Sequence, residues 1–229
     1  MKKYFKKPQL KFLPILFIGV ASAFTSCQKD NSNGGTTTTA KVRIVNAADG
    51  SASQDLYMDN IKLDASAVAY TQSSDYFTES SGSHSAKFTN SGSTTANVAF
   101  NVTLQADSSY TIYYTLSDTT RGSIITTNNL TAPAAGMAKV RVINLSSAAA
   151  ANIDVGLSAT SKLVTNLAYR TVSAYNSINA NTALYLYAAG SVNAMLSIPA
   201  TTIQAGKIYT VFISGSTAID LKYNIVAEN

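Results

Sequence analysis

One histidine, one cysteine and a group of acids are the side chains of this 229-residue sequence whose types could support chemistry. His84 is the sole histidine and lies in the segment GSHSAKF, beside an expected turn. A zinc site usually needs two or more His or Cys ligands, and a Ser–His–Asp triad would depend on this single residue. The sequence therefore favours an exposed loop histidine over a metal ligand or a general base.

Most of the acids in the first half of the chain fall within residues 49–79, namely Asp49, Asp55, Asp59, Asp64, Asp75 and Glu79. Calcium takes about six to eight oxygen ligands, which sandwich loops can supply, but the spacing matches no EF-hand loop. Nothing in the sequence places two carboxylates across a cleft, as a glycosidase requires. We expect turn and capping residues, with a calcium site as the alternative, and we predict no catalytic residue, metal or cofactor.

Residues 1–26 have the composition of an export signal. They combine a lysine-rich start with an apolar run from Phe12 to Phe24 and small residues before Cys27. Thirteen helical residues rise only about 20 Å, which is less than the roughly 30 Å hydrocarbon core. The pattern therefore predicts a cleaved signal peptide and not a permanent membrane span.

Cys27 is the only cysteine, so the chain cannot form an intramolecular disulfide. With the preceding Phe24-Thr25-Ser26 it resembles a Bacteroidota-type lipobox, in which cleavage before the cysteine is followed by its acylation. We therefore predict lipidation at Cys27 and attachment to a membrane through the lipid.

Residues 27–39 are polar and rich in Gly, Asn and Thr, which predicts a flexible tether. The opening CQKDN resembles signals that send Bacteroidota lipoproteins to the outer face of the outer membrane. We expect an outer-membrane, cell-surface location, with the periplasmic face as the alternative.

The stated net charge of +5 belongs to the export signal. Five of the 17 basic residues and none of the 12 acids lie in residues 1–26, so cleavage leaves 12 of each sign. A neutral mature chain lacks the electrostatic basis for nucleic-acid binding.

The remainder of the chain contains two similar copies of one segment. Ala40–Asn46 (AKVRIVN) returns 98 residues later as AKVRVIN, and LQADSSYTI at Leu104–Ile112 returns 99 residues later as IQAGKIYTV. A period this long indicates a duplicated domain. We predict repeat 1 at residues 40–133 and repeat 2 at residues 137–229. Asp154 is the only counterpart in repeat 2 of the clustered acids.

Each repeat has the two-residue alternation of half-buried strands, as in SYTIYYT at Ser109–Thr115. We therefore predict an all-β fold of two tandem immunoglobulin-like antiparallel β-sandwiches after the signal peptide and linker. The Cys–Trp–Cys signature of true immunoglobulin domains is absent, so packing must stabilise the fold.

Four aromatic residues lie on strand faces opposite apolar neighbours: Tyr113, Tyr185, Tyr187 and Phe212. Exposed aromatics serve carbohydrate- and protein-binding surfaces, and core or edge packing is the simpler alternative.

Asp118-Thr119-Thr120 also resembles an O-glycosylation sequon of Bacteroidota. Charge differs between the repeats, with net −3 for residues 40–136 and net +3 for residues 137–229. Opposite net charges could favour docking of one repeat on the other or contact between separate molecules. The difference is also compatible with no structural consequence, because salt screens such modest charges.

The openings AKVRIVNAA and AKVRVINLS, the Asp55-Leu56-Tyr57 segment and the repeated LQADSSYTIYY strand resemble the family called domain of unknown function 4397. The resemblance implies exported bacterial proteins with one or more β-sandwich copies. The family's usual His-Ala-Ser-Pro after the first strand is replaced here by Asn46–Asp49, and repeat 2 has Gly156 where repeat 1 has Tyr57. The family has no established activity.

Together these features predict an outer-membrane lipoprotein that is not an enzyme and acts as a surface-exposed binding or adhesion module. Its expected partners are the membrane, through the lipid, and a polysaccharide or protein ligand, but not nucleic acid. A periplasm-facing structural spacer or subunit of an envelope complex is the alternative.

Overall fold

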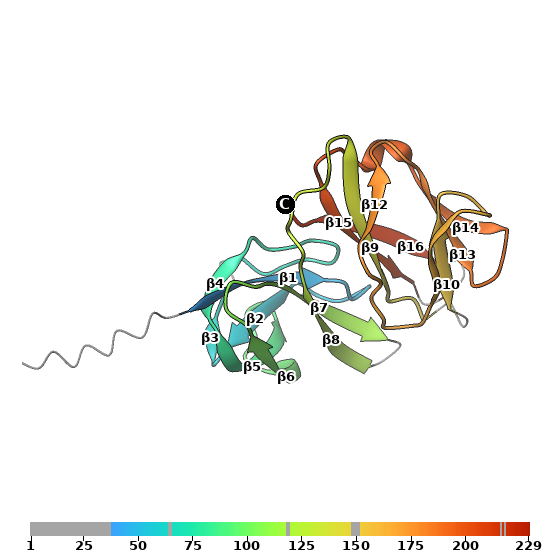
Figure 1. Cartoon of the computed structure of the whole chain (residues 1–229). Helices are drawn as coiled ribbons and strands as arrows, with labels where there is room; N and C mark the ends of the chain where they lie inside the picture. Colours follow the sequence, from blue (N-terminus) through green and yellow to red (C-terminus); the bar gives the residue numbers. More distant parts are fainter. Residues whose placement is uncertain (1–37, 64–65, 118–119, 148–151, 216, 218) are drawn as a thin grey trace, which may run out of the picture. The chain divides into compact units, whose positions relative to one another are not determined.

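β-Strands make up nearly all the regular structure in the computed structural model, which describes residues 38–229 apart from 64–65, 118–119, 148–151, 216 and 218 (Figure 1). These residues belong to one compact unit. The described part of the chain has no helix long and apolar enough to cross a membrane. The predicted signal peptide and Cys27 lie outside the described residues.

Repeat 1 forms two four-stranded sheets, in the orders β4-β1-β7-β8 and β3-β2-β5-β6. Its strands are β1 (Thr39–Asn46), β2 (Gln54–Met58), β3 (Ile61–Lys62), β4 (Phe77–Ser80), β5 (Gly82–Asn90), β6 (Ala96–Leu104), β7 (Ser109–Ser117) and β8 (Thr120–Thr127).

Repeat 2 has the same strand order, with sheets β12-β9-β15-β16 and β11-β10-β13-β14. Its strands are β9 (Met137–Asn144), β10 (Ile153–Gly156), β11 (Lys162–Leu167), β12 (Asn176–Asn179), β13 (Leu184–Ala188), β14 (Ala194–Ile198), β15 (Ile208–Ser214) and β16 (Lys222–Ala227), with a short 3-10 turn at Ala200–Thr202. The predicted all-β fold of two tandem sandwiches is confirmed, and the strands of the two repeats correspond one to one.

One strand pair in each repeat departs from the expected antiparallel arrangement. β1 runs parallel to β7, and β9 runs parallel to β15. Parallel neighbours cannot be joined by a tight hairpin and need a long crossover. Here strands β2–β6 of the repeat supply that crossover, so the first strand enters the sheet between β4 and β7.

The core of each sandwich lies between its two sheets and comes from alternating residues of the strands. In β1 the inward residues are Val42 and Ile44, which pack with Leu56, Phe88 and Ile112. Repeat 2 builds an equivalent core, with Val140 and Val142 from β9.

Two buried polar contacts recur in both repeats and explain part of the sequence repetition. Asn46 donates to the carbonyl of Val68 and accepts from the N–H of Ala48, and Asn144 makes the equivalent bonds with Leu167 and Ser146. In each repeat, an asparagine at the end of the first strand thus holds the chain that follows it.

The second recurring contact comes from a tyrosine near the start of the seventh strand. The Tyr110 hydroxyl accepts from the N–H of Gln105, and the Tyr209 hydroxyl accepts from the N–H of Gln204. Buried backbone and side-chain polar groups need such partners. The repeated LQADSSY and IQAGKIY blocks are therefore structural.

Candidate functional site

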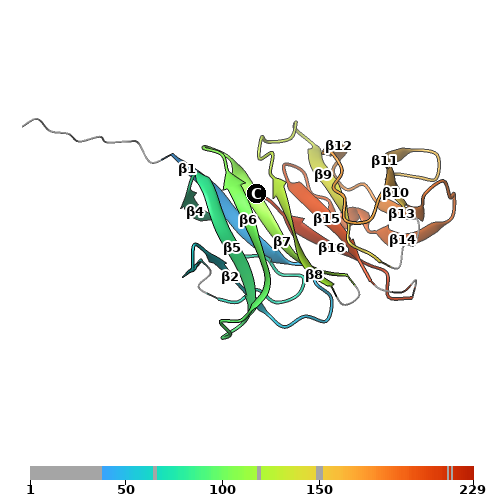
Figure 2. The ribbon, with the colours of Figure 1, turned by 90° about the horizontal axis from the view of Figure 1, so that it is seen from below.

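The two repeats contact each other through the outer face of one sheet in each. In Figure 2, β7 and β8 lie next to β9, β15 and β16. An apolar cluster joins the faces, with Val45 and Tyr113 from repeat 1 and Ile143, Phe212 and Val226 from repeat 2. The rings of Tyr113 and Phe212 meet edge to face with centroids 6.5 Å apart. The opposite net charges of the two repeats are compatible with docking of one repeat on the other, and these contacts confirm that the repeats dock.

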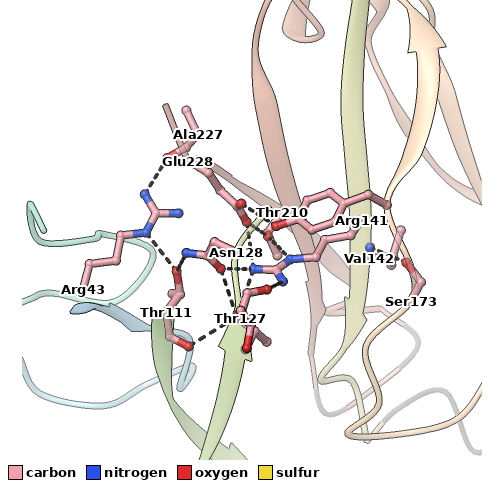
Figure 3. A network of polar contacts seen from close by, with 12 residues as sticks. Arg43, Thr111, Thr127, Asn128, Arg141, Val142, Ser173, Thr210, Ala227 and Glu228 are labelled. Carbon is pink, nitrogen blue, oxygen red and sulfur yellow. Dashed lines mark hydrogen bonds and ion pairs between the residues drawn. The ribbon is translucent and has the colours of Figure 1, made fainter. Parts of the chain in front are cut away.

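A buried ion pair lies beside this apolar cluster (Figure 3). Arg141 is only 3% exposed and its Nη2 lies 2.9 Å from Oε1 of Glu228, which is 2% exposed. The same nitrogen donates to Asn128 Oδ1 at 2.6 Å, and Nη1 donates to the Thr127 carbonyl at 2.9 Å, both in repeat 1. The guanidinium therefore links the last strands of the two repeats.

Glu228 has two further hydrogen-bond partners in repeat 2. It accepts hydrogen bonds from the hydroxyls of Thr210 and Tyr175. Burial, together with the neighbouring carboxylate, raises the pKa of Tyr175 far above its ordinary value, so this phenol stays a donor. A buried carboxylate that accepts three hydrogen bonds is well satisfied, and it depends on all three donors.

Arg43 of β1 occupies a similar place on the repeat 1 side. It is 4% exposed, donates from Nε to Thr111 at 3.0 Å, and donates from Nη1 to the Ala227 carbonyl at 2.7 Å. Sequence reasoning missed both arginines as site residues. The available signal was an arginine at the same position of KVRIVN and KVRVIN, within a strand that is otherwise apolar.

Exposed contacts complete the interface. Lys222 of repeat 2 pairs with Asp49 of repeat 1 at 3.1 Å, and Tyr70 shares a hydrogen bond with Ser214 at 2.9 Å. The hydrogen bond from Lys222 to Asp49 is the largest cause that raises the pKa of Lys222. Both charged partners are substantially exposed, so solvent weakens this pair.

The prediction that His84 is an exposed loop residue is wrong. His84 lies in β5 and is 8% exposed, with Nδ1 2.7 Å from Asp59 Oδ2 and Nε2 2.8 Å from the Ser80 carbonyl. Asp59 comes from the β2–β3 turn and Ser80 from the end of β4, so the imidazole joins elements of both sheets. The expectation failed because these acceptors lie elsewhere in the chain and do not show in the local pattern.

Both ring nitrogens of His84 face acceptors, so both bonds form together only when the ring carries two protons. Burial lowers the pKa of His84, but the hydrogen bonds to Asp59 and Ser80 and the charges of Asp59 and Glu79 outweigh it, and the pKa is raised. In turn, the bond from His84 is the main cause that lowers the pKa of Asp59.

This geometry predicts a pH-dependent contribution of His84 to stability. A raised folded pKa gives stability that is complete below the unfolded value near 6.5 and is lost as pH rises through the folded value. We expect His84→Gln to lower the melting temperature more at roughly pH 5.5 than at roughly pH 9. Thermal unfolding of the native chain and the variant at the two pH values tests this, and an equal difference at both would contradict it.

The clustered acids do not form one site, although Asp59 and Glu79 both lie near His84. Asp55 is buried and pairs with Lys62 at 3.0 Å, whereas Asp49 reaches repeat 2 and Asp75 is exposed. Asp64 lies outside the described residues. Within the described ranges no three His, Cys, Asp or Glu side chains could share a metal ion. The calcium alternative therefore gains no support from this structure.

Asp154 keeps the position of Asp55 for a structural reason. Asp55 accepts from the N–H of Gly92 in the β5–β6 turn, and Asp154 accepts from the N–H of Gly190 in the equivalent turn at 3.0 Å. Both glycines have positive φ. The repeated aspartate thus holds a hairpin turn in each repeat.

The aromatic residues proposed as exposed contacts are packed instead. Tyr113 and Phe212 are fully buried between the repeats, Tyr187 is buried and Tyr185 is half-buried. Across the described residues, every tyrosine and phenylalanine is buried or half-buried. Packing therefore accounts for these side chains better than exposure does, but two of them pack between the repeats and not in the predicted core or edge positions.

The outer face of the β3-β2-β5-β6 sheet carries a shallow groove of about 200 Å³. Tyr57, Asn60, Ser85 and Lys87 are among its lining residues, and the Lys87 ammonium lies 5.2 Å from the Tyr57 ring centroid. Because Leu56 and Met58 enter the core, alternation directs Tyr57 to the outer face. Repeat 2 has Gly156 at the position of Tyr57, where a side chain would meet the Ser161 carbonyl.

The structure does not test the two predicted modification sites. Cys27 and residues 118–119 of the suggested sequon lie outside the described residues. Thr120 is exposed at the start of β8.

Comparisons with known proteins identify one family. The profile described as "Domain of unknown function (DUF4397)" matches residues 40–156, just over half of the chain, which includes all of repeat 1 with β9 and β10. A search of curated proteins found no match.

Two solved structures are similar at low scores. CBMbc (family CBM26) from Eubacterium rectale Amy13K, in complex with maltoheptaose, is 8% identical with a TM-score of 0.27, covering 84% of this chain and 98% of that one. The Bacillus anthracis TIE protein is 14% identical with a TM-score of 0.23, covering 77% of this chain and 34% of that one. TM-scores this low carry no argument about function.

Proposed function

The chain belongs to the DUF4397 family, and we propose that it is an outer-membrane lipoprotein whose repeats form a non-catalytic binding or adhesion module at the cell surface. The proposal includes a signal peptide at 1–26, a lipid on Cys27 and a tether to residue 39, followed by repeats at 40–133 and 137–229. The partners it implies are the membrane, through the lipid, and a polysaccharide or protein.

The observation that carries the binding proposal is the groove at Tyr57 and Lys87. Docking of the repeats occupies one sheet face of each, and the groove lies on the opposite sheet of repeat 1, away from that interface. It combines an aromatic side chain with amide, hydroxyl and ammonium groups. Surfaces that recognise sugars or proteins use such a combination, with an aromatic anchor and a few polar groups that fix orientation.

The residues that could have acted in catalysis have other roles, which supports a non-enzymatic function. Both nitrogens of His84 are bonded within the fold, and Asp55 pairs with Lys62 and a backbone N–H. A general base must reach the proton of a substrate, and a histidine whose two nitrogens are occupied does not.

A periplasmic spacer or envelope-complex subunit is the second candidate. It is favoured by the absence of a fully exposed tyrosine or phenylalanine in the described part of the chain, and by the buried contacts that fix one repeat to the other. Such a protein would need a defined distance between its ends and no free ligand.

Protease shaving of intact cells, with a periplasmic protein followed as a control, separates the two candidates. Degradation of this protein while the control survives supports a surface module. Protection until the outer membrane is permeabilised overturns the surface location and moves the protein to the spacer class.

If the surface module is correct, Tyr57→Ala should weaken binding to a glycan or protein found in an immobilised screen by at least about tenfold. Tyr185→Ala, on the outer sheet of repeat 2, is the matched control and should bind like the native chain. Surface plasmon resonance measures both. Equal binding by all three proteins would exclude the groove as the site.

A further inference from the structure

The interface between the repeats has a symmetry that its separate contacts do not reveal. The strand register aligns Thr127 with Ala227, because each pairs with the equivalent tyrosine, Tyr110 or Tyr209. The next residues, Asn128 and Glu228, are therefore also equivalent. Arg43 and Arg141 hold the same position in β1 and β9.

Equivalent residues make reciprocal contacts across the interface. Arg43 Nη1 of repeat 1 donates to the Ala227 carbonyl of repeat 2, while Arg141 Nη1 of repeat 2 donates to the Thr127 carbonyl of repeat 1. Each Nε donates to a threonine of its own repeat, Thr111 or Thr210.

The aromatic contacts repeat the same pattern. The Arg43 guanidinium lies 5.0 Å from the ring centroid of Tyr76, and that of Arg141 lies 4.7 Å from the ring centroid of Tyr175. The remaining pair, Tyr113 and Phe212, joins equivalent positions of β7 and β15 directly across the interface. Reciprocity of this kind defines an isologous interface, as found in two-fold symmetric dimers.

We infer that the two repeats form an isologous, dimer-type interface within one chain, and that the partner which fits the Arg43 face or the Arg141 face is another copy of the repeat. This surface is separate from the proposed ligand groove. In this interface, the repeated Arg, Thr and Tyr residues serve to recognise the other repeat.

The symmetry is not complete: Thr126, which accepts from Arg141 Nη2, is equivalent to Val226. The difference that changes the charge is at positions 128 and 228. Glu228 of repeat 2 is a carboxylate, whereas its equivalent Asn128 is an amide, so Arg141 is paired with an acid and Arg43 is not. Within the described residues, Arg43 Nη2 has no hydrogen-bond partner, whereas Arg141 Nη2 reaches both Asn128 and Glu228.

Asn128 donates to Thr111 and Tyr76, the equivalents of the residues that donate to Glu228. A glutamate at position 128 would accept from those two hydroxyls after they rotate. Two-fold geometry would also bring its carboxylate to Arg43 Nη2.

Exchanging these two residues tests the symmetry in the full chain. Glu228→Asn leaves two buried arginines without an acid and should lower the melting temperature by roughly 10 °C. The double exchange N128E/E228N moves the acid to the equivalent place and should return the melting temperature to within about 3 °C of the native chain. A double variant as unstable as Glu228→Asn would overturn the inference.

Asn128→Glu alone tests the equivalence of positions 128 and 228 without removing the native acid, so its result does not depend on whether the other variants fold. It should unfold at or above the native melting temperature, because both arginines then have an acid. A fall of several degrees would show that position 128 is not equivalent to position 228, and would also overturn the inference.

The partner is tested by cutting the folded full chain at a protease site inserted into residues 131–136. We expect the cut chain to keep the mass of the uncut chain by light scattering, and to exchange a labelled repeat with unlabelled cut chains. Separation of the two halves would show that the faces do not bind each other unaided, and would refute the assignment of the partner.

Discussion

Arg141→Ala is expected to lower the free energy of unfolding by about 3–5 kcal/mol. The substitution removes the cation from Glu228, which is 2% exposed, and leaves that buried carboxylate with only the hydroxyls of Thr210 and Tyr175 as donors. It also removes the donors that reach Asn128 and the Thr127 carbonyl of repeat 1. Unfolding in urea, followed by circular dichroism, gives the difference.

Lys222→Ala is the matched control, because it breaks an exposed ion pair that joins the two repeats, whereas the buried pair of Arg141 with Glu228 lies within repeat 2. Lys222 and Asp49 are 51% and 38% exposed, so the expected loss is below about 1 kcal/mol. A loss for Arg141→Ala no larger than that for Lys222→Ala would mean that the buried network does not hold the repeats together.

The double variant Arg141→Met with Glu228→Leu separates the cost of a buried charge from the loss of packing. Replacing both partners of a buried ion pair by apolar residues is often much less costly than removing one. We therefore expect the double variant to recover part of the stability that Arg141→Ala loses.

The strands and the duplication could be predicted from sequence because their causes are local or periodic. Alternation in Ser109–Thr115 directs Tyr110 and Ile112 to the core, and the structure places both there. The repeated blocks contain Asn46 with Asn144, and Tyr110 with Tyr209, whose buried hydrogen bonds each sandwich needs.

The interface could not be predicted in the same way. Alternation assigns Arg43, Val45 and Tyr113 to the face opposite the core, and it cannot distinguish a face covered by another repeat from one exposed to water. The remaining clue was that both repeats place an arginine in the first strand and an aromatic residue at Tyr113 and Phe212. His84 escaped prediction for a related reason, since its acceptors Asp59 and Ser80 are brought to it only by folding.

Cys27→Ala is expected to abolish attachment to membranes and incorporation of labelled fatty acid. Each buried CH₂ of an acyl chain contributes about 0.8 kcal/mol, so several chains bind a bilayer almost irreversibly. Without them the mature chain has equal numbers of basic and acidic residues and no electrostatic attraction to anionic lipid. Fractionation of cells into membrane and released fractions, with palmitate labelling, measures both effects.

Ser26→Ala is the matched control for this experiment. It keeps a small residue before the cysteine, so cleavage and acylation should proceed and the protein should remain attached. Attachment of Cys27→Ala without fatty-acid label would instead mean that residues 1–26 or the repeats bind the membrane themselves. In that case the lipid on Cys27 is not what attaches the protein to the membrane. Fatty-acid label that persists in Cys27→Ala would show that the lipobox interpretation of Phe24-Thr25-Ser26-Cys27 is wrong.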